Sequence, residues 1–425
     1  VHLVSDTPAG ATEADRGARS PAMSADGRYV AFVTGRDFVP SDVNGEQDVY
    51  VADMLTGSFA RMPVANGASV RDDVWNLDMS ADGAWLAFES EDSFVPEDTN
   101  GEDDIYVQQL NQVLPEGDVR WAGATRYDTA IAVPAGTFPN GADTVVIATG
   151  ENWPDALCGS SLAGAVGAPI LLTPAAALPQ SVKDEIDRLG AENAYILGGT
   201  GVVSSAVETE LGGMLDGFVN RLAGPTRYMT SKVVADTVIK LTGGSKWRGP
   251  VLVTTGENFA DALAGAPLGA GLDWPVLLAN PITGDVYMPK GMSRAVILGG
   301  TGAVPASTEA MLKGSELSNS DVIRIGGATR YETAAMTAEY GVENGLLWNG
   351  VGMATGENFP DGLTGGASAG LNRTVVLLTP TASLAPAAST KLTDNADDIM
   401  TVQFFGGPGA VSTTVENQVK SILGM

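Results

Sequence analysis

The chain has 425 residues, more than one hydrophobic core usually holds, so we expect several domains. A hydrophobic content of 44% indicates a folded protein, and a net charge of −27 argues against binding to nucleic acids or anionic membranes. One cysteine and one histidine nearly exclude a disulfide framework, a Cys/His metal site and a histidine-dependent triad. No apolar run is long enough to span a membrane, and we interpret the start at Val1 as a result of processing or of the way the expressed chain was designed.

Residues 1–115 contain one element twice, because the segment Ser24–Phe32 recurs 56 positions later as Ser80–Phe88. Each copy has an Asp-Gly pair between apolar runs, which is typical of a β-hairpin turn. The sequence therefore predicts an antiparallel all-β region made of two similar strand–turn–strand units.

A second motif in each copy, Asp-x-Asn-Gly-x-x-Asp, places alternate oxygen atoms around a glycine turn, as calcium loops do. The bidentate glutamate of a complete calcium loop is missing, and a solvated Asx-turn hairpin is the alternative interpretation. Calcium is thus the candidate cofactor. The candidate metal ligands are Asp42, Asn44, Asp48, Asp98, Asn100 and Asp104.

Three motifs recur in the same phase through the rest of the chain, at intervals of roughly a hundred residues. An Arg-x-x-Gly-x-Thr-Arg-Tyr segment begins at Arg120, Arg221 and Arg324, a Thr-Gly-Glu-Asn segment follows, and a Gly-Gly pair comes last. Short apolar runs without alternation separate segments of helical period, which predicts parallel sheets covered on both faces by helices. We expect three α/β modules at residues 116–219, 220–321 and 322–425, preceded by the β-region at 1–115.

Two sets of phased arginines are the main candidates for ligand contact, because a guanidinium group can bind phosphate or carboxylate through two hydrogen bonds. The alternative is that they form salt bridges between modules or cap backbone carbonyls. The first set is Arg126, Arg227 and Arg330, and the second set is Arg120, Arg221 and Arg324.

The glycine pairs follow a strand and precede a helix, where backbone amides can hold a phosphate, although a tight turn without a ligand is the alternative. These pairs are Gly198 and Gly199, Gly299 and Gly300, and Gly406 and Gly407. The repeated aspartates at 155, 261 and 361 are expected one turn into a helix, in a structural role at its positive end.

As a set, the three phased motifs resemble the cell wall binding repeat 2 family over roughly Arg120 to Met425. This resemblance implies toprim-like modules around a pseudo-threefold axis that bind an anionic secondary polymer of a Gram-positive cell wall. The Ser-Ala-Asp-Gly element is similar to TolB-type β-propeller repeats. Two such blades cannot close a propeller, so we expect the chain to start inside a larger β-region, or neighbouring chains to complete it.

The leading hypothesis is a non-catalytic extracellular protein that anchors to the cell wall through its three modules. A structural subunit of a surface layer or filament, assembling with copies of itself through module faces and β-edges, is the alternative. An enzyme such as a wall hydrolase is disfavoured, because three near-equal copies leave no site with additional chemistry.

Overall fold

The computed structural model describes residues 4, 17–25, 27–36, 38, 47–54, 58–62, 74–80, 83, 85–91, 102–109, 117–139 and 141–425. The chain divides into two compact units, Val1–Glu116 and Gly117–Met425. None of the described helices is long and apolar enough to cross a membrane.

The described residues of the first unit form two antiparallel sheets, as the repeated hairpin motif predicts. In both copies, a glycine at positive φ closes the turn between the first two strands by donating its N–H to a serine carbonyl, from Gly27 to Ser24 and from Gly83 to Ser80. The assignment of these sheets to a propeller stays a prediction. Sheet 1 has the order β1 (Arg19–Met23), β2 (Tyr29–Thr34), β3 (Asp48–Asp53), β4 (Ser58–Arg61), and sheet 2 has the order β5 (Val74–Met79), β6 (Trp85–Ser90), β7 (Asp104–Gln109).

Sheets 1 and 2 pack face to face and share one hydrophobic core. Alternation along each strand sends every second side chain into this core, so Ala31 and Val33 of β2 belong to the same cluster as Leu86 and Phe88 of β6. The opposite side of sheet 1 carries a second cluster that includes Phe32.

The second unit contains three four-stranded parallel sheets, as expected for three α/β modules. The central strands are buried over nearly their whole length because helices cover both faces, which explains their continuous apolar runs. The sheet orders are β10 (Ile170–Thr173), β9 (Thr144–Thr149), β11 (Asn193–Leu197), β12 (Val219–Leu222); β14 (Val276–Ala279), β13 (Gly249–Thr255), β15 (Met292–Leu298), β16 (Val322–Ile325); and β18 (Thr374–Thr379), β17 (Leu347–Thr355), β19 (Thr401–Phe405), β8 (Gly117–Trp121). The toprim-like assignment stays a prediction.

The first helix of each module is capped by the threonine of the Thr-Arg-Tyr motif, which accepts a hydrogen bond from a backbone N–H of the first turn. The helices of the first module are α1 (Arg126–Thr137), α2 (Gly159–Val166), α3 (Gln180–Leu189) and α4 (Ser205–Met214). Those of the second are α5 (Arg227–Thr242), α6 (Ala260–Gly271) and α7 (Ala306–Lys313), and those of the third are α8 (Arg330–Glu343), α9 (Pro360–Leu371), α10 (Pro386–Asp394) and α11 (Thr413–Leu423).

The strand that opens each sequence repeat pairs with the sheet of the preceding module. β12 pairs with β11 and β16 with β15, so both sheets extend past the sequence boundaries at 219/220 and 321/322. β8, at the start of the first module, pairs with β19 near the end of the third. The three modules therefore form a closed ring in which every sheet borrows its last strand from the following repeat.

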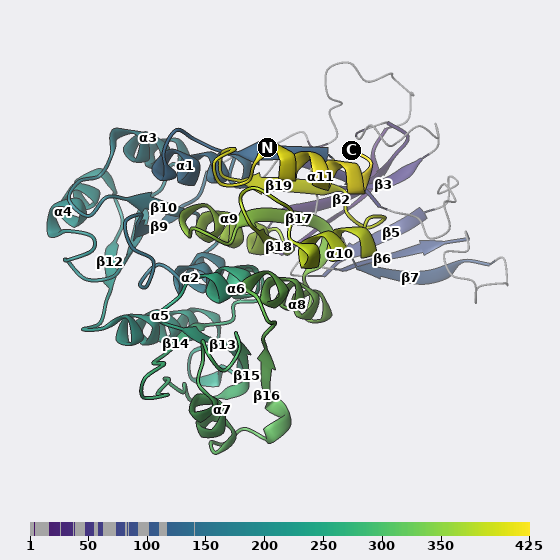
Figure 1. Ribbon diagram of the computed structural model, residues 1–425. Coiled ribbons are helices and arrows are strands. Elements are labelled where there is room, and N and C mark those ends of the chain that lie inside the picture. Colours follow the sequence, from purple (N-terminus) through teal and green to yellow (C-terminus); the bar gives the residue numbers. More distant parts are fainter. Residues whose placement is uncertain are drawn as a thin grey trace. The chain divides into compact units, whose positions relative to one another are not determined.

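Helices α2, α6 and α9 pack on one another at the centre of this ring (Figure 1). Small residues permit the close approach, because a Cβ atom at Gly164 of α2 would collide with the backbone of Ala270 in α6. A Cβ atom at Gly370 of α9 would likewise collide with the backbone of Pro267 in α6. The small-residue segments of the sequence thus correspond to the contacts between modules.

Candidate functional site

The first arginine set begins helices α1, α5 and α8 and reaches the end of the central strand in the same module. Each guanidinium group donates a hydrogen bond from Nη1 to the carbonyl of the glycine in the Thr-Gly-Glu-Asn segment. The following tyrosine lies against the same glycine, where no Cβ atom would fit. These pairs are Arg126 with Gly150, Arg227 with Gly256, and Arg330 with Gly356.

Each arginine of this set also lies over an aromatic ring of the preceding module, at a distance at which a cation–π interaction is effective. The ring follows the Glu-Asn pair of the Thr-Gly-Glu-Asn segment, so the contact joins two copies of the repeat. The distances from the arginine Cζ to the ring centroid are 5.9 Å for Arg126 and Phe359, 5.4 Å for Arg227 and Trp153, and 5.8 Å for Arg330 and Phe259.

The repeated aspartates complete the same junctions. Burial raises the pKa of Asp361, and the nearby Arg126 and a hydrogen bond from Thr129, both in the following module of the ring, oppose this rise. Asp155 and Asp261 have the corresponding partners, with burial again the largest cause of a raised pKa. Asp261 and Asp361 lie in the first turn of a helix, as expected, whereas the expectation is wrong for Asp155, which precedes α2.

The glycine pairs lie beside these aspartates at the ends of β11, β15 and β19. The first glycine of each pair has a positive φ of +91° at Gly198, +106° at Gly299 and +96° at Gly406. A Cβ atom at any of them would collide with the neighbouring aspartate, whereas Gly199, Gly300 and Gly407 face open space. The pair is therefore a tight turn whose first residue is fixed by geometry, and phosphate binding by its amides stays a prediction.

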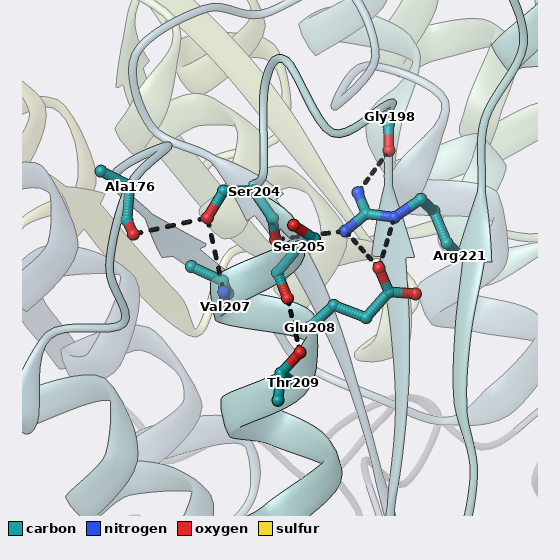
Figure 2. A network of polar contacts seen from close by, with 8 residues as sticks. All are labelled: Ala176, Gly198, Ser204, Ser205, Val207, Glu208, Thr209 and Arg221. Carbon is teal, nitrogen blue, oxygen red and sulfur yellow. Dashed lines mark hydrogen bonds and ion pairs between the residues drawn. The ribbon is translucent and has the colours of Figure 1, made fainter.

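The arginines of the second set lie on the borrowed strands and donate hydrogen bonds to the first glycine carbonyl of each of these turns. Arg221 of β12 donates to the Gly198 carbonyl and forms an ion pair with Glu208 of α4, 2.9 Å apart (Figure 2). Arg324 binds Gly299 and Glu309 in the same way, and Arg120 binds Gly406 and Glu416. These largely buried guanidinium groups are already paired, which favours the alternative role of holding successive modules together.

The three arginines of the first set differ in the number of polar partners that each guanidinium group has. Among the described residues, Arg126 and Arg330 each donate one hydrogen bond, to a glycine carbonyl. Arg227 additionally forms an ion pair with Glu257, with 3.5 Å between the charged atoms. The first set is therefore less fully paired within the protein than the second set, and ligand contact through either set stays a prediction.

The aromatic residues of the junctions were not among the candidates from the sequence. Trp153 lies 6.2 Å from Phe259, and Phe259 lies 6.3 Å from Phe359, measured between ring centroids. The signal was present, because an aromatic residue follows Gly-Glu-Asn in all three copies. The three aromatic side chains approach one another only because of the way the three modules pack.

The candidate calcium loops lie mostly outside the described residues, since only Asp48 and Asp104 of their six ligands are described. Asp48 is fully buried and pairs with Arg61 at 2.9 Å, so a cation already neutralises it. Within the described part of the chain, no group of three or more His, Cys, Asp or Glu residues is placed to hold a metal ion. Calcium binding stays a prediction.

The junction aspartates predict a characteristic pH dependence of stability. Their pKa is raised in the folded state, so the folded protein takes up protons before the unfolded chain does as the pH falls. Between the raised pKa and the ordinary value of 3.8, acidification therefore favours folding through these groups. We expect the difference in melting temperature between the wild type and the Asp155→Asn/Asp261→Asn/Asp361→Asn variant to shift in favour of the wild type as the pH falls toward about 4.

The control for this experiment is Asp187→Asn, which changes an exposed aspartate on α3. Two glutamates act in the opposite sense, because hydrogen bonds from Arg120 to Glu416 and from Lys313 and Arg324 to Glu309 lower their pKa. Their contribution is complete above about 4.5 and is lost as the pH falls through the lowered values, in wild type and variant alike. A melting difference that stays constant with pH would contradict the prediction.

The repeated segments match the family described as cell wall binding domain 2 (CWB2) at residues 120–208, 221–309 and 324–416. These matches cover more than half of the chain, which therefore belongs to this family. Each match starts at an arginine of the second set and ends at a glutamate that pairs with the next of these arginines, and the last glutamate pairs with the first arginine.

Two curated relatives come from Bacillus subtilis strain 168. The chain is 31% identical over 301 residues to an amidase enhancer and 30% identical over 307 residues to the N-acetylmuramoyl-L-alanine amidase LytC. Each match covers 71% of this chain but only 40% and 58% of the relatives, respectively.

Two solved structures from Clostridium difficile share the fold at 18% sequence identity. Cwp6 matches with a TM-score of 0.66 over 96% of this chain and 68% of its own, and Cwp8 with 0.62 over 80% and 59%.

Proposed function

We propose that the three-module unit binds non-covalently to an anionic polymer of the cell wall and holds the protein at the outer cell surface. The observation that supports this most directly is the threefold repetition of one junction, in which an arginine of one module lies over an aromatic ring of its neighbour. Guanidinium donors suit phosphate or carboxylate groups, and the exposed asparagines beside them suit sugar hydroxyls.

A polymer with a repeating unit can occupy several equivalent sites at once. Binding at one junction raises the effective concentration of the chain at the next, so weak sites combine into a strong attachment. The three arginines Arg126, Arg227 and Arg330 give such a polymer three similar anchor points on one rigid ring.

Attraction must be local, because the protein carries a net charge of −27. Long-range electrostatics oppose the approach of a polyanion, whereas a guanidinium group beside an aromatic ring acts over a few ångströms, where screening by salt is weak. Calcium that bridges exposed carboxylates of the protein and the polymer would add to this attraction.

We further propose that these modules have no catalytic role of their own. The matched region is shared with an amidase and with an amidase enhancer, two proteins with different named activities. A role common to both, attachment to the wall, accounts for the shared region more simply than a reaction does.

The test is co-sedimentation with purified Gram-positive cell walls, before and after extraction of their secondary polymers. We expect Arg126→Ala/Arg227→Ala/Arg330→Ala to reduce wall binding by about tenfold or more, because each change removes a charged hydrogen-bond donor. The matched control is Arg248→Ala, since Arg248 is exposed and also donates to a backbone carbonyl, but precedes β13 and so lies at the opposite end of that strand.

Melting curves separate a loss of binding from a loss of folding in these variants. Retained binding by the folded triple variant would refute the site, and undiminished binding to extracted walls would refute the anionic polymer as ligand. Weaker binding of the wild type at high salt is the expected sign of charge recognition.

A further inference from the structure

Sheet 2 of the first unit has an apolar face that is exposed. Ile105 and Val107 of β7 are 71% and 63% exposed, and Trp75 and Trp85 are also exposed on the neighbouring strands. Strand register places these side chains on one side of the sheet. Val107 pairs with Ala87, and Ile105 pairs with Glu89. Glu89 also pairs with Trp75 on the other neighbouring strand. We call Trp75, Trp85, Ala87, Ile105 and Val107 the open face.

The same positions in sheet 1 are buried. A shift of 56 residues relates Ile105 to Val49 and Val107 to Val51, which are 3% and 2% exposed. Their cover is sheet 2 itself, which packs Val74, Leu77, Met79, Leu86 and Phe88 against this side of sheet 1. The internal packing thus shows that an apolar sheet surface like that of sheet 2 can cover a face with these residues.

The outer side of sheet 1 carries the matching surface. The shift relates the five covering residues of sheet 2 to Ala18, Pro21, Met23, Val30 and Phe32, which are all apolar. Met23 is 62% exposed, whereas its counterpart Met79 is 9% exposed, and Ala18 and Pro21 are also exposed. Val30 is half-buried and Phe32 is buried, because both belong to the second cluster on this side of sheet 1. We call these five residues the outer face of sheet 1.

Each chain therefore carries the equivalents of both halves of its internal interface, with the open face exposed and the outer face of sheet 1 exposed at Ala18, Pro21 and Met23. Both sheets have the same strand order and the same irregularity in the first strand, with a positive φ of +50° at Ser20 and at Asn76. The backbone that shapes the internal contact is repeated at the exposed surfaces, so the internal packing geometry serves for the second contact as well.

We propose that copies of this protein associate head to tail, with the open face of one copy packed on the outer face of sheet 1 of the next. Burial of Ile105, Val107, Trp85 and Met23 removes large apolar side chains from water, which is the dominant favourable contribution in protein association. The contact joins two different surfaces, so it propagates along a series of copies until the series closes into a ring.

The test is sedimentation velocity on the full chain over a wide range of concentrations. We expect the wild type to show an apparent mass that rises with concentration, by about twofold or more. Ile105→Glu disables the open face and Met23→Glu disables the outer face, so each variant alone is expected to stay monomeric. An equimolar mixture retains one intact face of each kind and is expected to form a dimer, with no larger species.

The control is Ile282→Glu, which places the same charge at an isoleucine that is 92% exposed in the second unit, and it is expected to associate like the wild type. A monomeric wild type would overturn the proposal, as would association of Met23→Glu alone or a mixture that stays monomeric. The changed residues are exposed, so circular dichroism should show unchanged folding. Wall binding is measured in a separate experiment. Failure of the association proposal can therefore be distinguished from failure of the wall-binding proposal.

Discussion

Gly406→Ala is expected to destabilise the protein by about 3 kcal/mol and to weaken wall binding. Gly406 has a φ of +96°, which side chains rarely adopt, and its missing Cβ atom leaves room for the carboxylate of Asp361. An added methyl group would displace this aspartate, which interacts with Arg126 and Thr129. One substitution at the turn would thus disturb the junction between the third module and the first.

Gly407→Ala is the control in the same turn, because a Cβ atom there meets nothing within 4 Å. Chemical denaturation of both variants measures the difference in unfolding free energy, and wall co-sedimentation measures the effect on the junction. Equal stability of the two variants would show that the turn is not constrained by Asp361.

Gly164→Ala is expected to reduce stability by about 2 to 4 kcal/mol, although alanine is the better helix former. Its Cβ atom would collide with the carbonyl oxygen of Ala270, a backbone atom that moves only if α2 and α6 separate. Helices α2, α6 and α9 each contact both of the others at the centre of the unit, so separating α2 from α6 also loosens the neighbouring junctions.

Gly212→Ala is the matched control, because Gly212 lies within α4 and faces open space. That change is expected to stabilise the protein by about 0.5 to 1 kcal/mol, since alanine restricts the unfolded chain and favours the helix. In thermal unfolding, we therefore expect the melting temperature to fall for Gly164→Ala and to rise for Gly212→Ala. A shift in the same direction for both would contradict the packing argument.

Closure of the ring explains why the repeat units stay together as one unit. A parallel sheet that ended at β19 would leave backbone groups unpaired along its edge, and β8 covers that edge with a strand from the start of the first module. Arg120 and Glu416 then fasten this strand, 296 residues apart in sequence. The same strand pairing occurs at all three junctions, and at one of them it joins segments from opposite ends of the unit. No module is therefore left at an open end.

The number of modules, the alternation of buried strands and helices, and the arginines, aspartates and glycines that recur in phase were all predictable from the sequence. These properties are local, because continuous apolar runs and threonine caps act within a few residues. The antiparallel hairpins of the first unit were predictable for the same reason, since Asp-Gly turns act locally.

Which copies of these residues contact one another depends on how the modules pack. Arg120 and Arg126 belong to one motif, yet the first is paired with Glu416 and the second lies over Phe359, because packing and not sequence assigns the partners. Val49 and Ile105 occupy equivalent positions, and only the presence of a neighbouring sheet makes one buried and the other exposed. A repeated sequence encodes the same surfaces in every copy, and the neighbours that cover them determine whether a surface becomes core, junction or exposed face.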